Sequence, residues 1–145
     1  MRPKVAKSRR SDTERAAEHY LYHEYKCLPH TIRRAVRTKY QSVDFWGCDV
    51  MAKDEWGHSY FAQVTTGGVE AVRQRRRKLE KIPWNDLEHI MVLQMIETPD
   101  PLDNRKKKFY FRVHEMDKTR ELEWIVGLEE IPRDWFKKLR EVSHE

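Results

Sequence analysis

Apolar positions along the chain follow two different spacings, which predict helices and strands in a definite order. Residues 11–25 begin with a serine suited to a helix N-cap, and Ala17, Leu21 and Tyr25 then recur at every fourth position. This spacing predicts a helix. In residues 31–40 apolar side chains again lie four apart, among arginines and a lysine, a pattern that suits either a helical turn or an irregular basic strand.

The middle of the chain predicts a hairpin, a helix and a buried strand. Residues 43–52 and 58–66 are rich in β-branched and aromatic side chains, and the sequence KDEWG between them suits a turn. A pair of glycines then breaks the second strand. Residues 69–82 carry one narrow apolar stripe among six basic residues, which predicts a helix, and residues 89–97 form the continuous apolar run of a strand buried on both faces.

The last third of the chain predicts a loop, two strands and a closing helix. Residues 99–104 read as the loop, residues 106–116 alternate as a strand, and residues 121–128 suit another. Residues 131–142 predict an amphipathic helix, with four side chains expected to face inward: Trp135, Phe136, Leu139 and Val142. The complete order predicts an α/β (α+β) fold, with a mixed central β-sheet flanked by helices.

Size and composition favour one folded domain. The chain has 145 residues, of which 37% are charged, 39% hydrophobic and 11% aromatic, so its large apolar side chains are too frequent for a disordered chain. We expect a mobile basic arm over residues 1–10 and a single domain over residues 11–145.

The net charge of +5 is concentrated in clusters, which favours a polyphosphate partner. The clusters are RPKVAKSRR, RRAVRTK, RQRRRK and RKKK. Solvated faces of helices and strands often carry such runs as well, so the clusters alone leave both interpretations open. The residues expected to contact nucleic acid are Arg33, Arg34, Arg37, Lys39, Arg73, Arg75, Arg76, Arg77 and Lys78.

Several functional classes find no support in the sequence. Cys27 and Cys48 are too few for a disulfide framework, and no set of ligands completes a zinc site, so we expect two reduced thiols in a cytoplasmic protein. No apolar run is long enough to span a membrane. Glycine patterns of nucleotide-binding loops and the GxSxG motif of hydrolases do not occur.

Asp49 stands within an apolar stretch, where a lone carboxylate is costly unless it is paired or binds a cation. Three interpretations are open: an acid at a strand edge facing water, a salt bridge to an arginine, or a metal ligand. Gln63 and Thr65 share one face of the following strand with Phe61, and a hairpin would bring that face beside Asp49. If Glu14 also reaches this place, its oxygens complete the environment that Mg²⁺ prefers.

Glu14 in SDTER, Asp49 in GCDVMA, and the strand FAQVTT followed by a basic helix and an apolar strand together resemble the PD-(D/E)xK nuclease-like superfamily. Within it, the chain is similar to the archaeal Holliday junction resolvases and the Mrr-type restriction endonucleases. The resemblance covers roughly residues 11–97 and implies a restriction-endonuclease-like core.

By this resemblance, Glu14, Asp49 and Gln63 would bind Mg²⁺ or Mn²⁺, and the third residue of the second-strand motif would be a lysine that positions the attacking water. Here that residue is Thr65, whose hydroxyl cannot supply the positive charge. Either a cation of the next helix such as Arg73 replaces the lysine, or the site no longer cuts DNA. The catalytic set that the resemblance implies is Asp49, Gln63, Thr65 and Arg73.

The first functional hypothesis is therefore a metal-dependent DNA endonuclease, resolvase-like and acting on DNA that is possibly branched. The alternative is a nuclease-fold module that has lost catalysis and binds DNA or a protein partner; a third is an ordinary α+β interaction module. Resolvase-like enzymes work as two-fold dimers, and the apolar residues 121–132 would suit such an interface.

Overall fold

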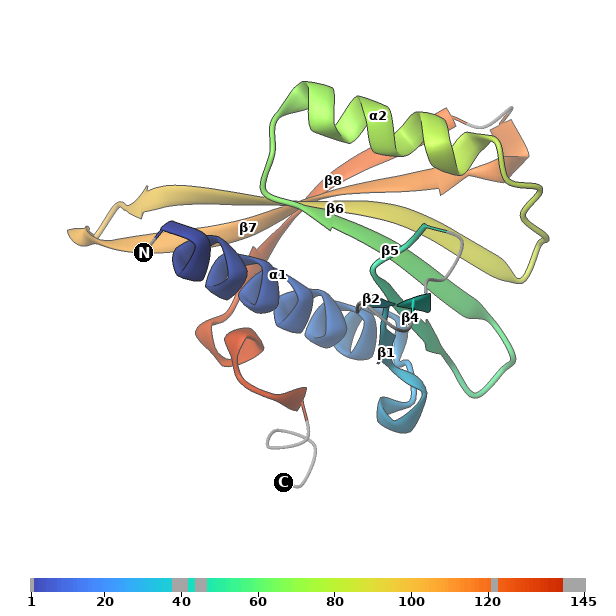
Figure 1. The fold of residues 1–145 in the computed structure, drawn as a ribbon, viewed down its shortest axis with the longest axis horizontal. Coiled ribbons are helices and arrows are strands. Elements are labelled where there is room, and N and C mark those ends of the chain that lie inside the picture. Colours follow the sequence, from blue (N-terminus) through green and yellow to red (C-terminus); the bar gives the residue numbers. More distant parts are fainter. Residues whose placement is uncertain (1, 38–41, 44–46, 121–122, 140–145) are drawn as a thin grey trace.

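A computed structural model describes residues 2–37, 42–43, 47–120 and 123–139; of residues 2–11, 36–37, 42–43 and 120 it describes the backbone alone. A six-stranded mixed sheet forms the middle of this structure, with one helix on each face (Figure 1). Its strands, in spatial order, are β1 (Arg33–Arg34), β4 (Val50–Lys53), β5 (Ser59–Thr65), β6 (Glu88–Asp100), β7 (Asp103–Asp117) and β8 (Glu123–Ile131). Only β5 and β6 run parallel in this sheet. The predicted mixed sheet flanked by helices is confirmed.

Shorter elements complete the described chain. Strands β2 (Val36–Arg37) and β3 (Ser42–Val43) form a separate antiparallel pair. Three 3-10 helices are η1 (Pro29–Thr31), η2 (Lys118–Arg120) and η3 (Arg133–Phe136). No helix in the described part of the chain has both the length and the apolar character needed to cross a membrane.

Helix α1 (Arg2–Tyr25) covers one face of the sheet. It begins at Arg2 rather than at the expected Ser11, so the backbone of the expected mobile arm continues the same helix. The helix ends where Lys26 adopts a left-handed conformation (φ 57°), and the amide of Cys27 donates to the carbonyl of Leu21 at 3.3 Å.

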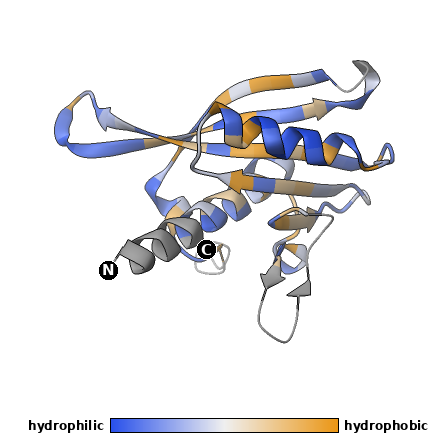
Figure 2. Ribbon diagram, turned by 45° about the horizontal axis from the view of Figure 1, so that its top comes forward, coloured by the Kyte–Doolittle hydropathy of each residue, from blue (hydrophilic) through white to orange (hydrophobic). Residues whose placement is uncertain are grey.

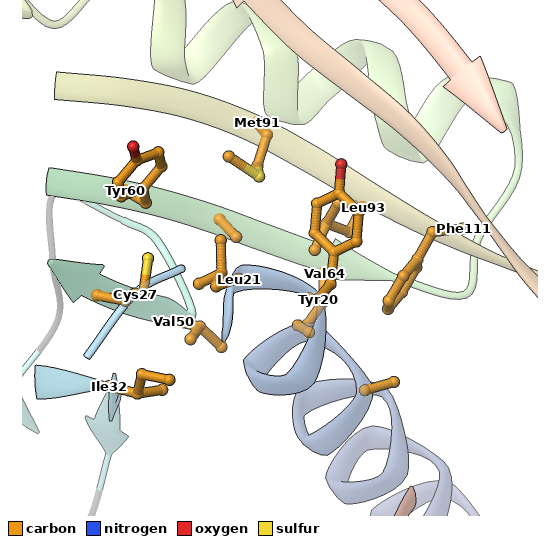
Figure 3. Packing of buried hydrophobic residues seen from close by; sticks show 14 of the residues in the cluster. Tyr20, Leu21, Cys27, Ile32, Val50, Tyr60, Val64, Met91, Leu93 and Phe111 are labelled. Atoms are coloured by element: carbon orange, nitrogen blue, oxygen red, sulfur yellow. The ribbon is translucent and has the colours of Figure 1, made fainter. Parts of the chain in front are cut away.

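The larger apolar core lies between α1 and the sheet (Figure 3). Ala17 and Leu21 of the helix are fully buried there, against Val50, Val64 and Leu93 of three adjacent strands. Their spacing of four along α1 is the one that predicted this helix, because residues four apart share one helical face.

The predicted hairpin is present as β4 and β5. Its turn is held by Asp54, whose Oδ1 accepts hydrogen bonds from the amides of Trp56 and His58 at 2.9 and 3.0 Å. Gly57 has a φ of 88°, which glycine adopts without strain. The sequence KDEWG therefore forms the turn for the expected reason.

The second helix, α2 (Val69–Glu80), connects β5 to β6 and covers the opposite face of the sheet (Figure 1). It buries Val72 and Leu79 against a second apolar cluster that includes Phe61 and Val92. A Cβ atom on Gly67 would lie 2.7 Å from the Cβ of Ala71, so the strand-to-helix connection needs a glycine here. The predicted strand, glycine break, helix and buried strand are all confirmed.

Three regions differ from the expectation or decide between alternatives. Thr31 ends η1, and residues 32–37 form strands β1 and β2 and contain no helix. The expected loop at residues 99–104 is a tight turn between β6 and β7, held by a hydrogen bond from the amide of Leu102 to Asp100 Oδ1 at 2.9 Å.

The predicted closing helix is wrong over residues 131–138, because only η3 forms there and residue 137 is a bend. Trp135 and Leu139 are nevertheless buried and Phe136 is half-buried, so three of the expected apolar contacts are present. Val142 lies outside the described residues.

Candidate functional site

Asp49 lies immediately before β4 and ties this strand to its neighbours. Its Oδ2 accepts a hydrogen bond from the amide of Val64 at 2.9 Å, and its own amide donates to the carbonyl of Ala62 at 2.9 Å. Its carbonyl accepts the amide of Ala35 at 2.8 Å. The carboxylate thus accepts the hydrogen bond that a backbone carbonyl of β4 would accept if the strand continued. This places Asp49 next to β5, the strand of Gln63 and Thr65.

Gln63 and Thr65 face α2, as their spacing with Phe61 predicts. Their neighbours Ala62 and Val64 belong to the core beneath α1, so the alternation of a strand turns Gln63 and Thr65 to the other side. Both are buried. Gln63 Nε2 donates to the carbonyl of Gly47 at 2.7 Å, and Thr65 Oγ1 accepts the amide of Gly67 at 2.9 Å. Both polar side chains therefore hold loops in place.

Glu14 lies on α1, the helix that covers the opposite face from Gln63. Its Oε1 is 3.8 Å from Arg34 Nη1, and the same arginine donates from Nε and Nη2 to Glu18 at 2.9 and 3.1 Å. The structure brings Asp49 beside the strand of Gln63 and Thr65, but it does not bring Glu14 and Gln63 to one face. Within the described ranges, no group of three or more His, Cys, Asp or Glu side chains could hold a metal ion.

The ion pairs of Arg34 explain why the pKa of its guanidinium group is raised. Burial would lower the pKa of Arg34, but the hydrogen bond to Glu18 and the charges of Glu18 and Glu14 outweigh it and raise the pKa. Arg34 was expected at a nucleic-acid surface, and in the structure it joins β1 to α1.

The other predicted contacts before β4 are only partly described. Arg33 is exposed, and its Nη1 donates to the carbonyls of His30 and Ile32. Arg37 belongs to β2, where only the backbone is described, and Lys39 lies outside the described residues.

Four of the basic residues of α2 form its outward surface, which we call the basic helix face: Arg73, Arg75, Arg77 and Lys78. The exposed guanidinium of Arg73 pairs with Glu70 at 3.1 Å, on the helix surface. Arg75 is half-buried and donates to the carbonyl of Ala71 at 3.2 Å, while Arg77 and Lys78 are exposed. Arg73, the expected replacement for the family's lysine, therefore forms its ion pair within its own helix.

Arg76 differs from its neighbours because its side chain turns toward the sheet. Its Nη2 contacts Nδ1 of His114, and its guanidinium carbon lies 5.2 Å from the ring centre of Trp124. Trp124 Nε1 donates to Glu80 at 2.6 Å. Burial lowers the pKa of Arg76, partly offset by the charge of Glu80. Arg76, a predicted nucleic-acid contact, thus holds α2 on the sheet.

His114 continues this network into the buried strands. With Arg76 as the donor, Nδ1 of His114 must accept, so its Nε2 donates to Gln94 Oε1 at 3.2 Å. Gln94 Nε2 then donates to the carbonyl of Gly67 at 3.0 Å. These bonds require a neutral His114, because a protonated ring could not accept from Arg76. Burial, with the charges of Arg76 and Arg112, lowers the pKa of His114 to about 4.

Sequence reasoning missed Gln94, His114 and Trp124 as partners of α2. A signal was present, because Gln94 interrupts an apolar strand and His114 occupies an inward position of an alternating one. Buried polar side chains in such places need partners. The sequence does not state which partner each one finds.

Two further surfaces stand apart from Asp49. A pocket of about 400 Å³ on the α1 side is lined by Asp12, Thr13, Thr66, Met95, Glu97, Phe109 and Phe136. Its carboxylates are paired, Asp12 with Arg15 at 3.7 Å and Glu97 with Lys107 at 2.6 Å.

The second surface is β8, the segment expected as a dimer interface. It forms an edge of the sheet, and three of its apolar side chains are at least half exposed: Ile125, Val126 and Leu128. Figure 2 shows this apolar stretch on the outermost strand.

No protein-family model, curated protein or solved structure matches this chain.

Proposed function

We propose that this protein is a nucleic-acid-binding module built on a nuclease-like core. The order α1, β4, β5, α2 and β6, with β5 and β6 parallel, supports such a core, since it follows the order on which the resemblance rests. The basic helix face carries the proposal. Helix α2 turns Val72 and Leu79 to the sheet and presents the basic helix face outward, where phosphates can reach it.

The contacts of the motif residues favour binding over cleavage. Asp49 and Gln63 hold backbone groups of neighbouring segments, and Arg34 supplies the positive charge that Glu14 would otherwise need from a metal ion. Thr65 carries no charge, and its hydroxyl oxygen accepts a hydrogen bond from the amide of Gly67 in the following loop. These four motif residues thus have structural roles that do not depend on catalysis.

The binding test compares two double variants that remove equal charge. Arg77→Gln with Lys78→Gln alters the basic helix face, whereas Lys137→Gln with Lys138→Gln alters exposed lysines after η3, on the side of α1. We expect the first pair to weaken binding of labelled DNA several-fold, and the second to leave it nearly unchanged. Equal losses would show that net charge alone matters and would overturn the assigned surface.

A metal-dependent endonuclease is the second candidate. One observation favours it: the carboxylate of Asp49 lies against the strand of Gln63 and Thr65, bonded to the amide between them. This candidate requires Glu14 to leave Arg34 and reach the other carboxylate, because the present arrangement does not fit a metal ion held by Glu14, Asp49 and Gln63 together. Mg²⁺ or Mn²⁺ would then stabilise charge on a phosphodiester.

Cleavage distinguishes the two candidates. Labelled linear, single-stranded and four-way-junction DNA would be incubated with Mg²⁺ or Mn²⁺ and either the wild-type protein or Asp49→Ala. The proposed module binds without cutting any of them. Metal-dependent cutting that disappears in Asp49→Ala would establish the nuclease instead.

A further inference from the structure

The hairpin of β6 and β7 projects beyond the body of the sheet as a two-stranded ribbon (Figure 1). Strand β8 pairs with β7 only from Phe109 onward, and β6 pairs with Lys108, Lys107 and, after a register shift between Pro99 and Asp100, with Asp103. The ribbon contains the cluster RKKK, residues 105–108, which is separate in sequence from the basic helix face. Leu102 at its tip is 93% exposed, so the tip is open to solvent.

The two sides of the ribbon differ because side chains of a strand alternate between faces. Phe111 of β7 packs in the core beneath α1, which places Lys107 on the α1 side. We assign Arg105 to the same side by continuing the alternation past the register shift between Pro99 and Asp100. The intervening positions face the α2 side. They are Lys106, Lys108, Tyr110 and Arg112, a row that we call the ribbon track. Its members recur about every 7 Å along the strand.

The ribbon track leads directly to the loop before α2. Thr65 pairs with Gln94 across β5 and β6, and Gln94 pairs with Arg112 across β6 and β7. These three residues therefore form one row on the α2 side, and Thr65 and Arg112 are about 10 Å apart between their backbones. Gln94 also bonds to Gly67, immediately before the helix. A strand of nucleic acid that follows the ribbon track would thus reach the basic helix face.

The charges on the two sides of the ribbon are used differently. On the α1 side Lys107 pairs with Glu97 at 2.6 Å, and Arg105 pairs with Asp103 at 3.4 Å. On the α2 side, within the part of the chain that the structure describes, Lys106 and Arg112 form no ion pair.

Two acids reduce the positive charge of the ribbon track without cancelling it. Glu130 Oε1 lies 3.5 Å from Lys108 Nζ. Asp100 Oδ1 accepts a hydrogen bond from the amide of Leu102 in the turn. Three basic side chains thus face two acids on this side, and the exposed basic residues of α2 lie on the same side. The track remains the side of the ribbon with cations available to phosphates.

We propose that the ribbon track is a second nucleic-acid contact, which binds the phosphates of a strand and guides it to the loop between β5 and α2. This inference rests on the proposed function. Lys106, Lys108 and Arg112 provide charge along one line, and Tyr110 between them offers an aromatic surface to a base or sugar.

The chain provides a matched control within the same strand. Lys106→Gln with Lys108→Gln removes two charges from the ribbon track, and Arg105→Gln with Lys107→Gln removes two from its opposite side. Binding of labelled single-stranded and duplex DNA would be measured by fluorescence anisotropy over a range of salt concentrations, after thermal melts show that both variants fold.

We expect the track variant to bind roughly tenfold more weakly, with a slope of log K against log salt smaller by about 1 to 2 because phosphate contacts are lost. The control should stay within about twofold of wild type, since its charges are already paired. This inference alone would be overturned if the wild type binds DNA and the track variant binds equally well. The same holds if both variants lose affinity equally. Failure of the wild-type protein to bind DNA would overturn the proposed function as well.

Discussion

Arg34 donates from Nε and Nη2 to the two carboxylate oxygens of Glu18, at 2.9 and 3.1 Å, and its Nη1 lies 3.8 Å from Glu14. This arrangement places one cation between two acids of α1 and fastens β1 to that helix. The resemblance to metal-dependent nucleases implies that a divalent ion would provide the positive charge near Glu14. Here an arginine of the chain provides it.

Arg34→Gln should destabilise the fold, because Glu14 and Glu18 would lose their partly buried cation. The loss in the free energy of unfolding should be about 2 kcal/mol at neutral pH. Urea unfolding measures it. Arg33→Gln, at the exposed neighbouring position, is the control and should change stability by less than about 0.5 kcal/mol. Equal effects of the two substitutions would contradict the role assigned to Arg34.

Asp49→Ala should destabilise the protein by about 1–2 kcal/mol, because the amide of Val64 loses its acceptor. Asp49→Asn keeps an oxygen at this place and should lose less. Thermal or urea unfolding without added metal distinguishes this role from that of a metal ligand. If Asp49 served only as a metal ligand, its removal would leave the metal-free protein as stable as before, or more stable.

Acid should weaken the packing of α2 through His114. Burial and the charges of Arg76 and Arg112 lower its pKa from 6.5 to about 4. The unfolded chain therefore takes up a proton first as the pH falls. Stability associated with neutral His114 is fully present above pH 6.5 and decreases from there toward pH 4, by up to about 3 kcal/mol.

Unfolding measured against pH in the wild type and in His114→Gln tests this dependence. The wild type should lose more stability than the variant over the acidic range, since other histidines titrate in both proteins. Parallel curves for the two proteins would mean that His114 does not couple the packing of α2 to pH.

Strand β8 should pair with a second copy of the chain if the expected dimer forms there. Its exposed edge carries Val126 at 50% exposure, beside Ile125 and Leu128. Val126→Lys should shift a dimer toward monomer, because edge lysines oppose strand addition. Sedimentation at several protein concentrations measures the shift, with Leu102→Lys at the ribbon tip as the control. A monomeric wild type, or equal shifts in the two variants, would refute this interface.

The order of the central elements was predictable because local signals and packing agree. The break at Gly67 separates a period of two in β5 from a period near four in α2, and the structure needs a glycine there. Asp54 and Gly57 likewise mark the β4–β5 turn. In each case one residue type meets a local steric or hydrogen-bonding requirement.

The closing helix was not predictable from spacing alone. Trp135 and Leu139 are four apart and both buried, as in a helix, yet the backbone between them bends at residue 137. Tertiary packing therefore produced the burial pattern of an α-helix on a backbone that is not continuously α-helical. The spacing of apolar residues predicts which side chains are buried, but it does not determine the backbone conformation that buries them.

The candidate site was predicted in part for a similar reason. Alternation along β5 places Gln63 and Thr65 on one face, and the hairpin brings Asp49 beside them. The position of Glu14 depends instead on which face of the sheet α1 covers, and no local pattern specifies that. The contact between Arg76 and His114 joins residues 38 positions apart, so it too depends on the complete fold.

The most direct test of the central claim is the salt dependence of DNA binding by the wild-type protein. Anisotropy of labelled single-stranded, duplex and four-way-junction DNA would be followed between about 50 and 200 mM salt. We predict a linear fall of log K with log salt, steep enough to report several released counterions. Affinity that is weak and insensitive to salt on every substrate would contradict a nucleic-acid-binding function.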